Sequence, residues 1–147
     1  MATTNPIGNK FLSFDLDGQE YAIAIEHVQE IIGLLPITPV PGRAHYFSGV
    51  VNLRGKIVPI IDLRRRLGMA PFEAGDQSCV IVVTAHGSVT GVLVDRVGEV
   101  GAIAREEIQA VPGDFDAGAR QVLGIATYGE TSRVLLDVER VLDAETM

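Results

Sequence analysis

Apolar and polar residues alternate over much of this chain, which is the period-2 pattern of half-buried β-strands. Leu12, Phe14 and Leu16 show it first, and Asp17-Gly18 follows them as a turn into a second strand. Runs of the same kind recur to the end of the chain. The predicted strands cover residues 12–16, 21–25, 49–53, 57–61, 78–84, 89–95, 97–104, 124–128 and 133–138. The pattern therefore predicts a mostly β protein built from hairpins, with a few short helices.

The period changes after Glu26. Apolar residues then recur at the i, i+3, i+4 and i+7 spacing of one helix face, and these residues are Val28, Ile31, Ile32 and Leu35. A short helix is therefore predicted here, with a proline-rich extended loop after it. Residues 105–121 are predicted to form a loop with a helical turn or two, and residues 139–142 a short terminal helix.

The central stretch, residues 49–68, carries the most specific local signals. Two apolar runs meet at Arg54-Gly55, and the glycine supplies the positive φ that a two-residue hairpin turn needs. Pro59 lacks an N–H, so its strand is expected to lie at a sheet edge or to carry a bulge. Asp62 is predicted to cap a short helix, which Gly68 can end. The basic run 64–66 in this helix is expected to face solvent.

The second half of the chain repeats the first weakly. A shift of about 69 positions places His86-Gly87 on Asp17-Gly18, and a shift of about 75 places the run that starts at Leu135 on the run that starts at Ile60. The larger shift is explained by a small insertion within residues 105–121. Each half, about 10–77 and 78–143, then holds about five short strands, the number in a small barrel. Two such lobes, with exchange of a strand between them possible, would bury apolar surface against each other and leave a groove.

Composition and charge exclude several function classes. The net charge of −7 over 147 residues argues against a general binder of nucleic acid or of anionic membranes. Cys79 is the only cysteine, so disulfides within the chain and thiolate metal clusters are excluded. Residues 1–9 are polar, lack the apolar core of a signal peptide and are expected to be disordered. The expected location is the cytoplasm.

No catalytic or metal-binding motif stands out. The three histidines, His27, His45 and His86, share no metal-ligand spacing, and His86 is expected in a solvated turn. Neither a nucleophile elbow nor a phosphate-binding glycine loop is present in the sequence. We therefore predict a protein that is not an enzyme and that uses no cofactor or metal.

The motif Asn52-Leu53-Arg54-Gly55, followed by the run from Pro59 to Arg64, resembles the signature of the CheW family. That family comprises adaptor proteins of bacterial chemotaxis and the related regulatory domain of CheA histidine kinases. Residues 28–31 and 91–95 are similar to the family as well, and the resemblance extends over roughly residues 10–143. It implies one domain of two SH3-like five-stranded barrels that share a hydrophobic seam.

The resemblance also implies a function and a site. A scaffold adaptor would bind the regulatory domain of a CheA-type kinase and the cytoplasmic tip of a chemoreceptor, and would reach the membrane only through receptor arrays. The receptor-side candidates carried over are Val28, Glu30, Gly49 and Arg54, with Val97 and Val100 as their repeat counterparts. We further expect Glu30 and Arg54 to pair at the groove between the lobes, since arginine and carboxylate form an oriented ion pair. The kinase-binding residues stay open.

Three alternatives remain at this point. The chain could serve a related chemosensory pathway that controls motility, development or a second messenger. It could be the regulatory domain of a larger signalling enzyme, or a phospho-regulated adaptor, although neither a receiver nor a kinase core is visible. A small β-barrel that binds a ligand or nucleic acid is the third, and the acidic charge and 5% aromatic content argue against it.

Overall fold

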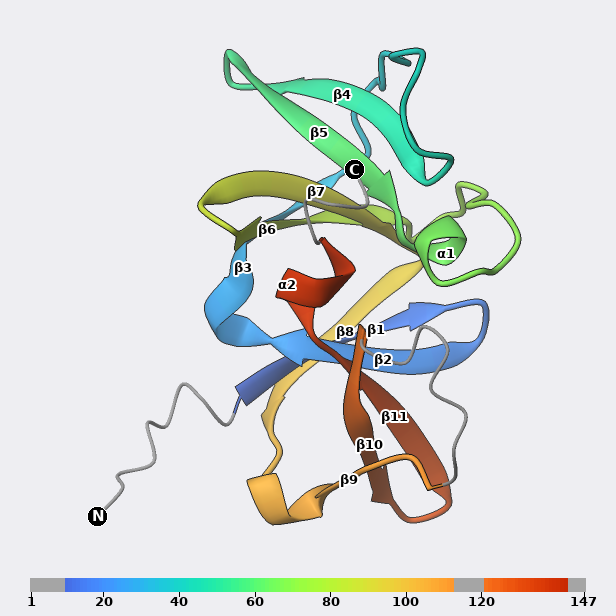
Figure 1. The fold of residues 1–147 in the computed structure, drawn as a ribbon, viewed down its shortest axis with the longest axis vertical. Helices are drawn as coiled ribbons and strands as arrows, with labels where there is room; N and C mark the ends of the chain where they lie inside the picture. The colour runs from blue at the N-terminus through green and yellow to red at the C-terminus, as the bar shows by residue number, and fades with distance from the viewer. Residues whose placement is uncertain (1–9, 113–120, 143–147) are drawn as a thin grey trace.

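The computed structural model describes residues 10–112 and 121–142. These residues form two β-sheets, drawn one above the other in Figure 1, with short helices beside their junction. One sheet has the strand order β8-β1-β2-β11-β10-β9, and we call it the first lobe. The other has the order β3-β6-β7-β5-β4, and we call it the second lobe. The predicted mostly β fold of two small lobes is confirmed.

The elements of the first lobe come from both ends of the described chain. Its strands are β1 (Lys10–Leu16), β2 (Gln19–Ala24), β8 (Arg96–Ala102), β9 (Ile108–Gln109), β10 (Val122–Tyr128) and β11 (Thr131–Leu136), with the 3-10 turn η3 (Arg105–Glu107) and the helix α2 (Val138–Val141). Five of these strands are long, and β9 adds a two-residue sixth. Since β1 and β2 pair with β8 and β11, the lobes exchange strands between the two halves of the sequence.

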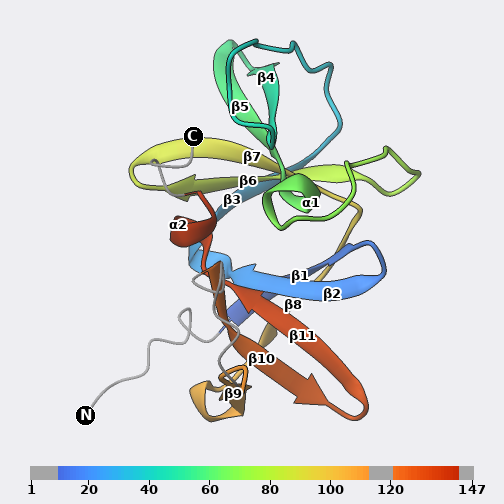
Figure 2. The ribbon, with the colours of Figure 1, turned by 45° about the vertical axis from the view of Figure 1, so that its right-hand side comes forward.

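The second lobe is continuous in sequence. Its strands are β3 (Val28–Gly33), β4 (Phe47–Leu53), β5 (Lys56–Asp62), β6 (Cys79–Ala85) and β7 (Ser88–Val94), with the 3-10 turn η2 (Ile25–His27) before β3 and the helix α1 (Leu63–Arg66) after β5. In Figure 1 the β4–β5 hairpin projects from the top of the molecule, and the β10–β11 hairpin extends toward the bottom. Figure 2 shows the same separation after a turn of 45°.

Three predicted hairpin turns are confirmed in detail. Asp17, Arg54 and His86 each have a positive φ, near +52°, and a glycine with a positive φ follows each of them. Positive φ at both central residues is the geometry of a type I′ turn, whose twist matches that of the strands it joins.

The predicted helix over residues 26–35 is wrong. Its first residues belong to η2, and residues 28–33 form the strand β3, which pairs with β6. Along β3, half-buried and exposed residues alternate, as expected for a strand with one covered face. Ile31 lies on the uncovered face and is 45% exposed although it is apolar. Together with the apolar residues of the covered face, it produces a spacing in the sequence that imitates a helix.

Pro59 lies in β5, which is not an edge strand, so that expectation is corrected. Its cross-strand partner is Val50, whose backbone N–H and C=O both bond to Thr38 instead of to β5. The parallel pairing of β5 with β7 begins only at Ile60. The missing N–H of Pro59 therefore removes no bond to β4, while a bulge in β4 lies one position further along.

The internal repeat has structural counterparts. β4 carries its bulge between Phe47 and Gly49, and β10 carries one between Val122 and Gly124. Each lobe also contains one parallel strand pair, β5 with β7 and β11 with β2. The helices α1 and α2 follow corresponding strands and are capped by the side chains of Asp62 and Asp137. The same local devices thus build both lobes.

Buried apolar side chains form three clusters, and the largest lies between the lobes. This seam core joins residues of β1 and β2, such as Phe14 and Ile23, to residues of β6 and β7, such as Ile81 and Val92. The side chains of Leu63 and of α2 complete it. The cores inside each lobe are smaller, with Leu135 central to one and Val82 to the other. The seam is thus filled by side chains that neither lobe could bury alone.

Candidate partner-binding site

The expected pair of Glu30 and Arg54 is present. Arg54 stands at the tip of the β4–β5 hairpin, and its Nη2 donates to Oε2 of Glu30 on β3. The side chain of Arg54 is 66% exposed and that of Glu30 is 28% exposed. Because β3 and β4 are the two outer strands of the same sheet, the pair closes the second lobe on itself. The pair therefore lies within one lobe. The expectation that it lies at the groove between the lobes is wrong.

A shallow hollow of about 590 Å³ lies beside this pair on the second lobe. Its lining comes from four strands and includes Gln29 on β3, the β4–β5 hairpin from Leu53 to Pro59, and Val89 on β7. Ile57 in this lining is 67% exposed, which is high for a large apolar side chain. An exposed apolar residue next to an exposed arginine is a common composition of protein-binding surfaces.

The other predicted site residues do not all gather there. Val28 lies on β3 two positions before Glu30 and packs partly against the seam core. Val97 also packs against the seam core, but from β8 in the first lobe. Val100, on the same edge strand, is 48% exposed. The six candidates are thus distributed over two edge strands and one hairpin.

Gly49 is buried inside β4 and presents no side chain to a partner. A Cβ at this position would lie 2.3 Å from the carbonyl oxygen of Thr38 and 2.8 Å from Cγ2 of Ile37. Gly124 shows the same crowding against Gln109 and Ile108 in the first lobe. The close approach of the two backbones thus explains why this residue is glycine.

Sequence reasoning missed two polar contacts that join the lobes, and the basic run 64–66 is not simply solvated. Arg64 on α1 donates through Nη2 to Oδ2 of Asp95 at 2.5 Å, and Asp95 also accepts from the backbone N–H of Asp17 at 2.7 Å. The hydrogen bond to Asp95 raises the pKa of Arg64 above its ordinary value. The charged residues Asp95 and Arg96 between two predicted strands were visible in the sequence, but nothing there indicated that Asp95 lies near residue 64.

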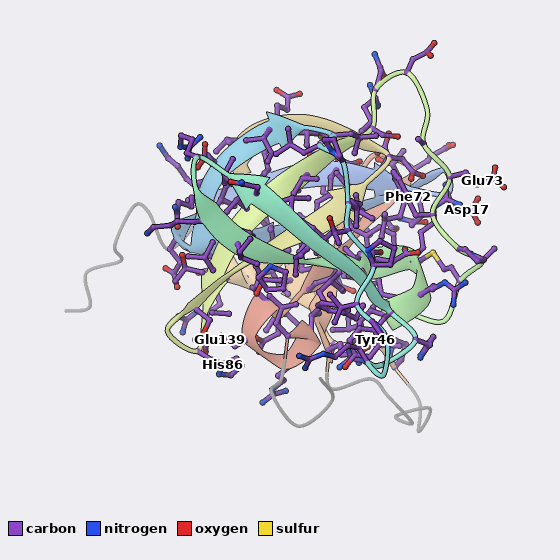
Figure 3. The ribbon with its side chains drawn as sticks, turned by 90° about the horizontal axis from the view of Figure 1, so that it is seen from above. Asp17, Tyr46, Phe72, Glu73, His86 and Glu139 are labelled. Carbon is purple, nitrogen blue, oxygen red and sulfur yellow. The ribbon has the colours of Figure 1, made fainter. Side chains whose placement is uncertain are left out.

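Arg66 forms the second contact. Its Nε donates to the carbonyl of Val141 at 2.8 Å, and its guanidinium lies 5.1 Å above the ring of Tyr46. His86 contacts α2 as well, with Nε2 at 2.6 Å from the carbonyl oxygen of Glu139, and Figure 3 shows these two residues side by side. The terminal helix of the first lobe is therefore held by side chains of the second. His86 lies exposed in its turn, as predicted, and makes this contact as well.

The described residues offer little reactive chemistry. Burial raises the pKa of the Cys79 thiol, which leaves little thiolate near neutral pH. Burial, with Asp17 nearby, likewise raises the pKa of Tyr21. Within residues 10–112 and 121–142, no three His, Cys, Asp or Glu side chains are grouped so that they could hold a metal ion. The helices of the described chain are all too short to cross a membrane.

Comparison with curated proteins finds relatives over nearly the whole chain. The chemotaxis protein CheW of Klebsiella aerogenes is 37% identical over 142 residues, which cover 96% of this chain and 86% of that protein. The chemotaxis protein CheW of Bacillus subtilis is 33% identical over 95% of this chain and 90% of its own length. Both relatives are named as chemotaxis proteins.

A solved structure and a family model agree with these relatives. The crystal structure of the scaffolding protein TtCheW from Thermoanaerobacter tengcongensis matches with a TM-score of 0.84 at 28% identity, and the match covers 95% of this chain and 96% of that one. Its two SH3-like lobes correspond to those described here. The model of the CheW-like domain matches residues 10–146. This chain therefore belongs to the family of CheW-like domains.

Proposed function

We propose that this protein is a non-catalytic scaffold adaptor that couples the cytoplasmic tips of chemoreceptors to a CheA-type histidine kinase and controls the activity of that kinase. Membership of the CheW-like family supports this role, as do relatives that are named as chemotaxis proteins and as a scaffolding protein. We also propose that residues 10–143 act as one domain, and that membrane association is indirect, through receptors.

The observation that carries the proposal is the exposed guanidinium of Arg54, oriented by Glu30 beside the hollow that contains Ile57. An arginine that is already oriented loses less conformational entropy when it binds, and arginine is enriched among residues that dominate binding energy. The apolar side chain beside it would supply burial. This surface fits the receptor side of the adaptor, with Val28 and Glu30 on the adjoining strand and Val97 and Val100 as outer contacts.

Chemotaxis is the pathway that the relatives favour. A related chemosensory pathway with another output gains no support from the names of these relatives. An adaptor of either kind would act by geometry, holding the kinase and the receptor at fixed positions, while the array supplies avidity.

The decisive experiment is reconstitution of the kinase, receptor-bearing vesicles and this protein. We expect Arg54→Glu to lower receptor-dependent kinase activity about tenfold or more, because a reversed charge in a binding surface leaves groups of the partner unpaired. Binding to the kinase alone should stay near that of the unchanged protein. Arg105→Glu is the matched control, since Arg105 is an exposed arginine in η3 of the other lobe.

A charge swap separates recognition from local structure. The double variant Glu30→Arg/Arg54→Glu keeps an ion pair between β3 and the hairpin but exchanges its ends. If the pair serves only to close the lobe, the double variant recovers kinase control. If Arg54 contacts the receptor, the double variant does not recover kinase control. Unchanged kinase control by Arg54→Glu itself would remove this residue from the site.

A further inference from the structure

Arginine is an unusual residue type for the backbone conformation at position 54. Three turns of the described chain have a non-glycine residue with φ near +52° followed by a glycine. Two of these positions hold Asp17 and His86, and aspartate and histidine are among the types enriched at positive φ. The third is Arg54. For arginine, the contact between Cβ and the carbonyl group makes this region unfavourable.

The internal repeat supplies a direct comparison. The shift of 75 that relates Gly49 to Gly124 places Arg54 on Gly129, which begins the turn between β10 and β11. Gly129 has a φ of +63°, so the first position of both turns has a positive φ. The first lobe has a glycine at this position, which adopts a positive φ freely. The second lobe has an arginine, which does not. Strain of this kind, observed at a surface tip, marks a position selected for what its side chain does.

Asn52 is the residue that stabilises this turn. Its Oδ1 accepts a hydrogen bond from the backbone N–H of Gly55 at 2.8 Å, across the three positions that include Arg54. In the other two turns with this geometry, the residues at the same offset are Asp15 and Thr84, and both engage other partners. Asp15 pairs with Arg96, and Thr84 donates to Gln29. Among these three turns, only the strained one is held by a side chain from its own strand.

We propose that Asn52 is a positioning residue for partner recognition: by holding the N–H of Gly55 it keeps Arg54 at positive φ, so that the guanidinium reaches Glu30 and stays oriented toward a partner. Arg54 is then fixed at both ends, its backbone by Asn52 and its head group by Glu30. Fixing a side chain before binding reduces the entropy lost in the complex. The consequence for signalling rests on the proposed function, whereas the conformational claim does not.

The test uses the full-length protein with Asn52→Ala, Asn52→Asp and Arg54→Gly. Asn52→Ala removes the acceptor, while Asn52→Asp keeps an oxygen at the same place. The first readout is the distance between the amide proton and Hα within Arg54, which is short when φ is positive. NMR of the free protein measures this distance. We expect it to be lost or averaged in Asn52→Ala and kept in Asn52→Asp.

The second readout is receptor-dependent kinase activity, which we expect Asn52→Ala to lower about three- to tenfold and Asn52→Asp to leave nearly unchanged. In the Arg54→Gly background, the same Asn52→Ala change should have no further effect, because the residue that it positions is gone. Circular dichroism of each variant checks that the two lobes remain folded.

The outcomes separate the two claims. If Arg54 keeps its positive φ in Asn52→Ala, the positioning role is refuted, whatever the kinase does. If Arg54 loses that conformation and kinase control is unaffected, the role of Arg54 in the proposed function is refuted instead. An equal loss of activity in the presence and absence of Arg54 would show that Asn52 acts through another group.

Discussion

Glycines at the two bulges show how a single residue type is fixed by its surroundings. Gly49 has a φ of +144° and a backbone carbonyl 2.3 Å from the place where a Cβ would stand. Resemblance to the CheW family made this residue a receptor contact in the sequence analysis, but its position is buried in the hairpin. Its contribution to binding would then come through the position of the hairpin that carries Arg54.

We therefore predict that Gly49→Ala lowers the free energy of unfolding by about 1–3 kcal/mol, because the backbone of Thr38 must move to admit a methyl group. Urea unfolding followed by circular dichroism measures this change. Gly101→Ala is the control, since nothing lies within 4 Å of its Cβ position and its φ lies outside the left-handed region. Equal effects of the two substitutions would contradict the argument.

The sequence was sufficient to predict the pair of Glu30 and Arg54, although the element that carries Glu30 was assigned wrongly. The turn at Arg54-Gly55 is a local signal, and the resemblance pointed to both residues. The role of Asn52 could not be predicted in the same way. Its hydrogen bond depends on the path of the backbone through the turn, and many asparagines near a glycine make no such bond.

At the scale of elements, α2 depends on its surroundings. It is a helix of four residues, too short to be stable alone. Asp137 caps its start, and Val138 and Val141 are buried in the seam core. Arg66 and His86, both from the second lobe, bind carbonyl oxygens near its end. The last helix of one lobe is thus completed by the other.

Removing the contact of Arg66 should weaken this attachment. We predict that Arg66→Met lowers the free energy of unfolding by about 1.5–3 kcal/mol, the usual range for a hydrogen bond with a charged donor. It should also speed amide exchange in α2. Arg65→Met is the matched control, because Arg65 makes only long, exposed contacts, at 3.8 Å with Asp62 and at 3.4 Å with the carbonyl oxygen of His45, and its side chain is 41% exposed. That variant should lose less than about 1 kcal/mol.

Among the elements, hairpins were predictable and β3 was not. A hairpin is specified by neighbouring residues, so its turn and its two apolar runs can be read together. β3 is held by β6, which is about 50 residues away, and the exposed apolar side chain of Ile31 interrupts the alternation of apolar and polar residues that would have revealed a strand. The partners of the basic run on α1 are also distant in sequence, so nothing in the sequence indicated anything but solvent around these arginines.

At the scale of the whole molecule, the seam core determines how the lobes are related. The seam core joins strands of both sheets. The Arg64–Asp95 and Arg66–Val141 contacts add polar links between the lobes. The repeat in the sequence predicted two similar modules with a shared apolar surface, and this is what the structure contains. The expectation of an arginine at the mouth of the seam was wrong, because Arg54 belongs to the closure of one lobe.

We predict that the two lobes unfold in one transition. Neither lobe core alone is as large as the seam, so separating the lobes exposes the largest buried apolar surface in the described chain. Amide exchange near Val82 and near Leu135, which lie in different lobe cores, should therefore report the same free energy of opening. Two distinct values, or two transitions in urea, would contradict this prediction.

The exchange of strands has a consequence for synthesis on the ribosome. The second lobe runs without interruption from β3 to β7, so it can assemble as soon as residue 94 has emerged. The hairpin of β1 and β2, made before it, must wait for β8 and then β11 before its two edges are covered. Until then these edges remain free to pair with other newly made chains. Slow or interrupted translation of the codons for residues 96–136 would thus leave the strands that were made first unprotected.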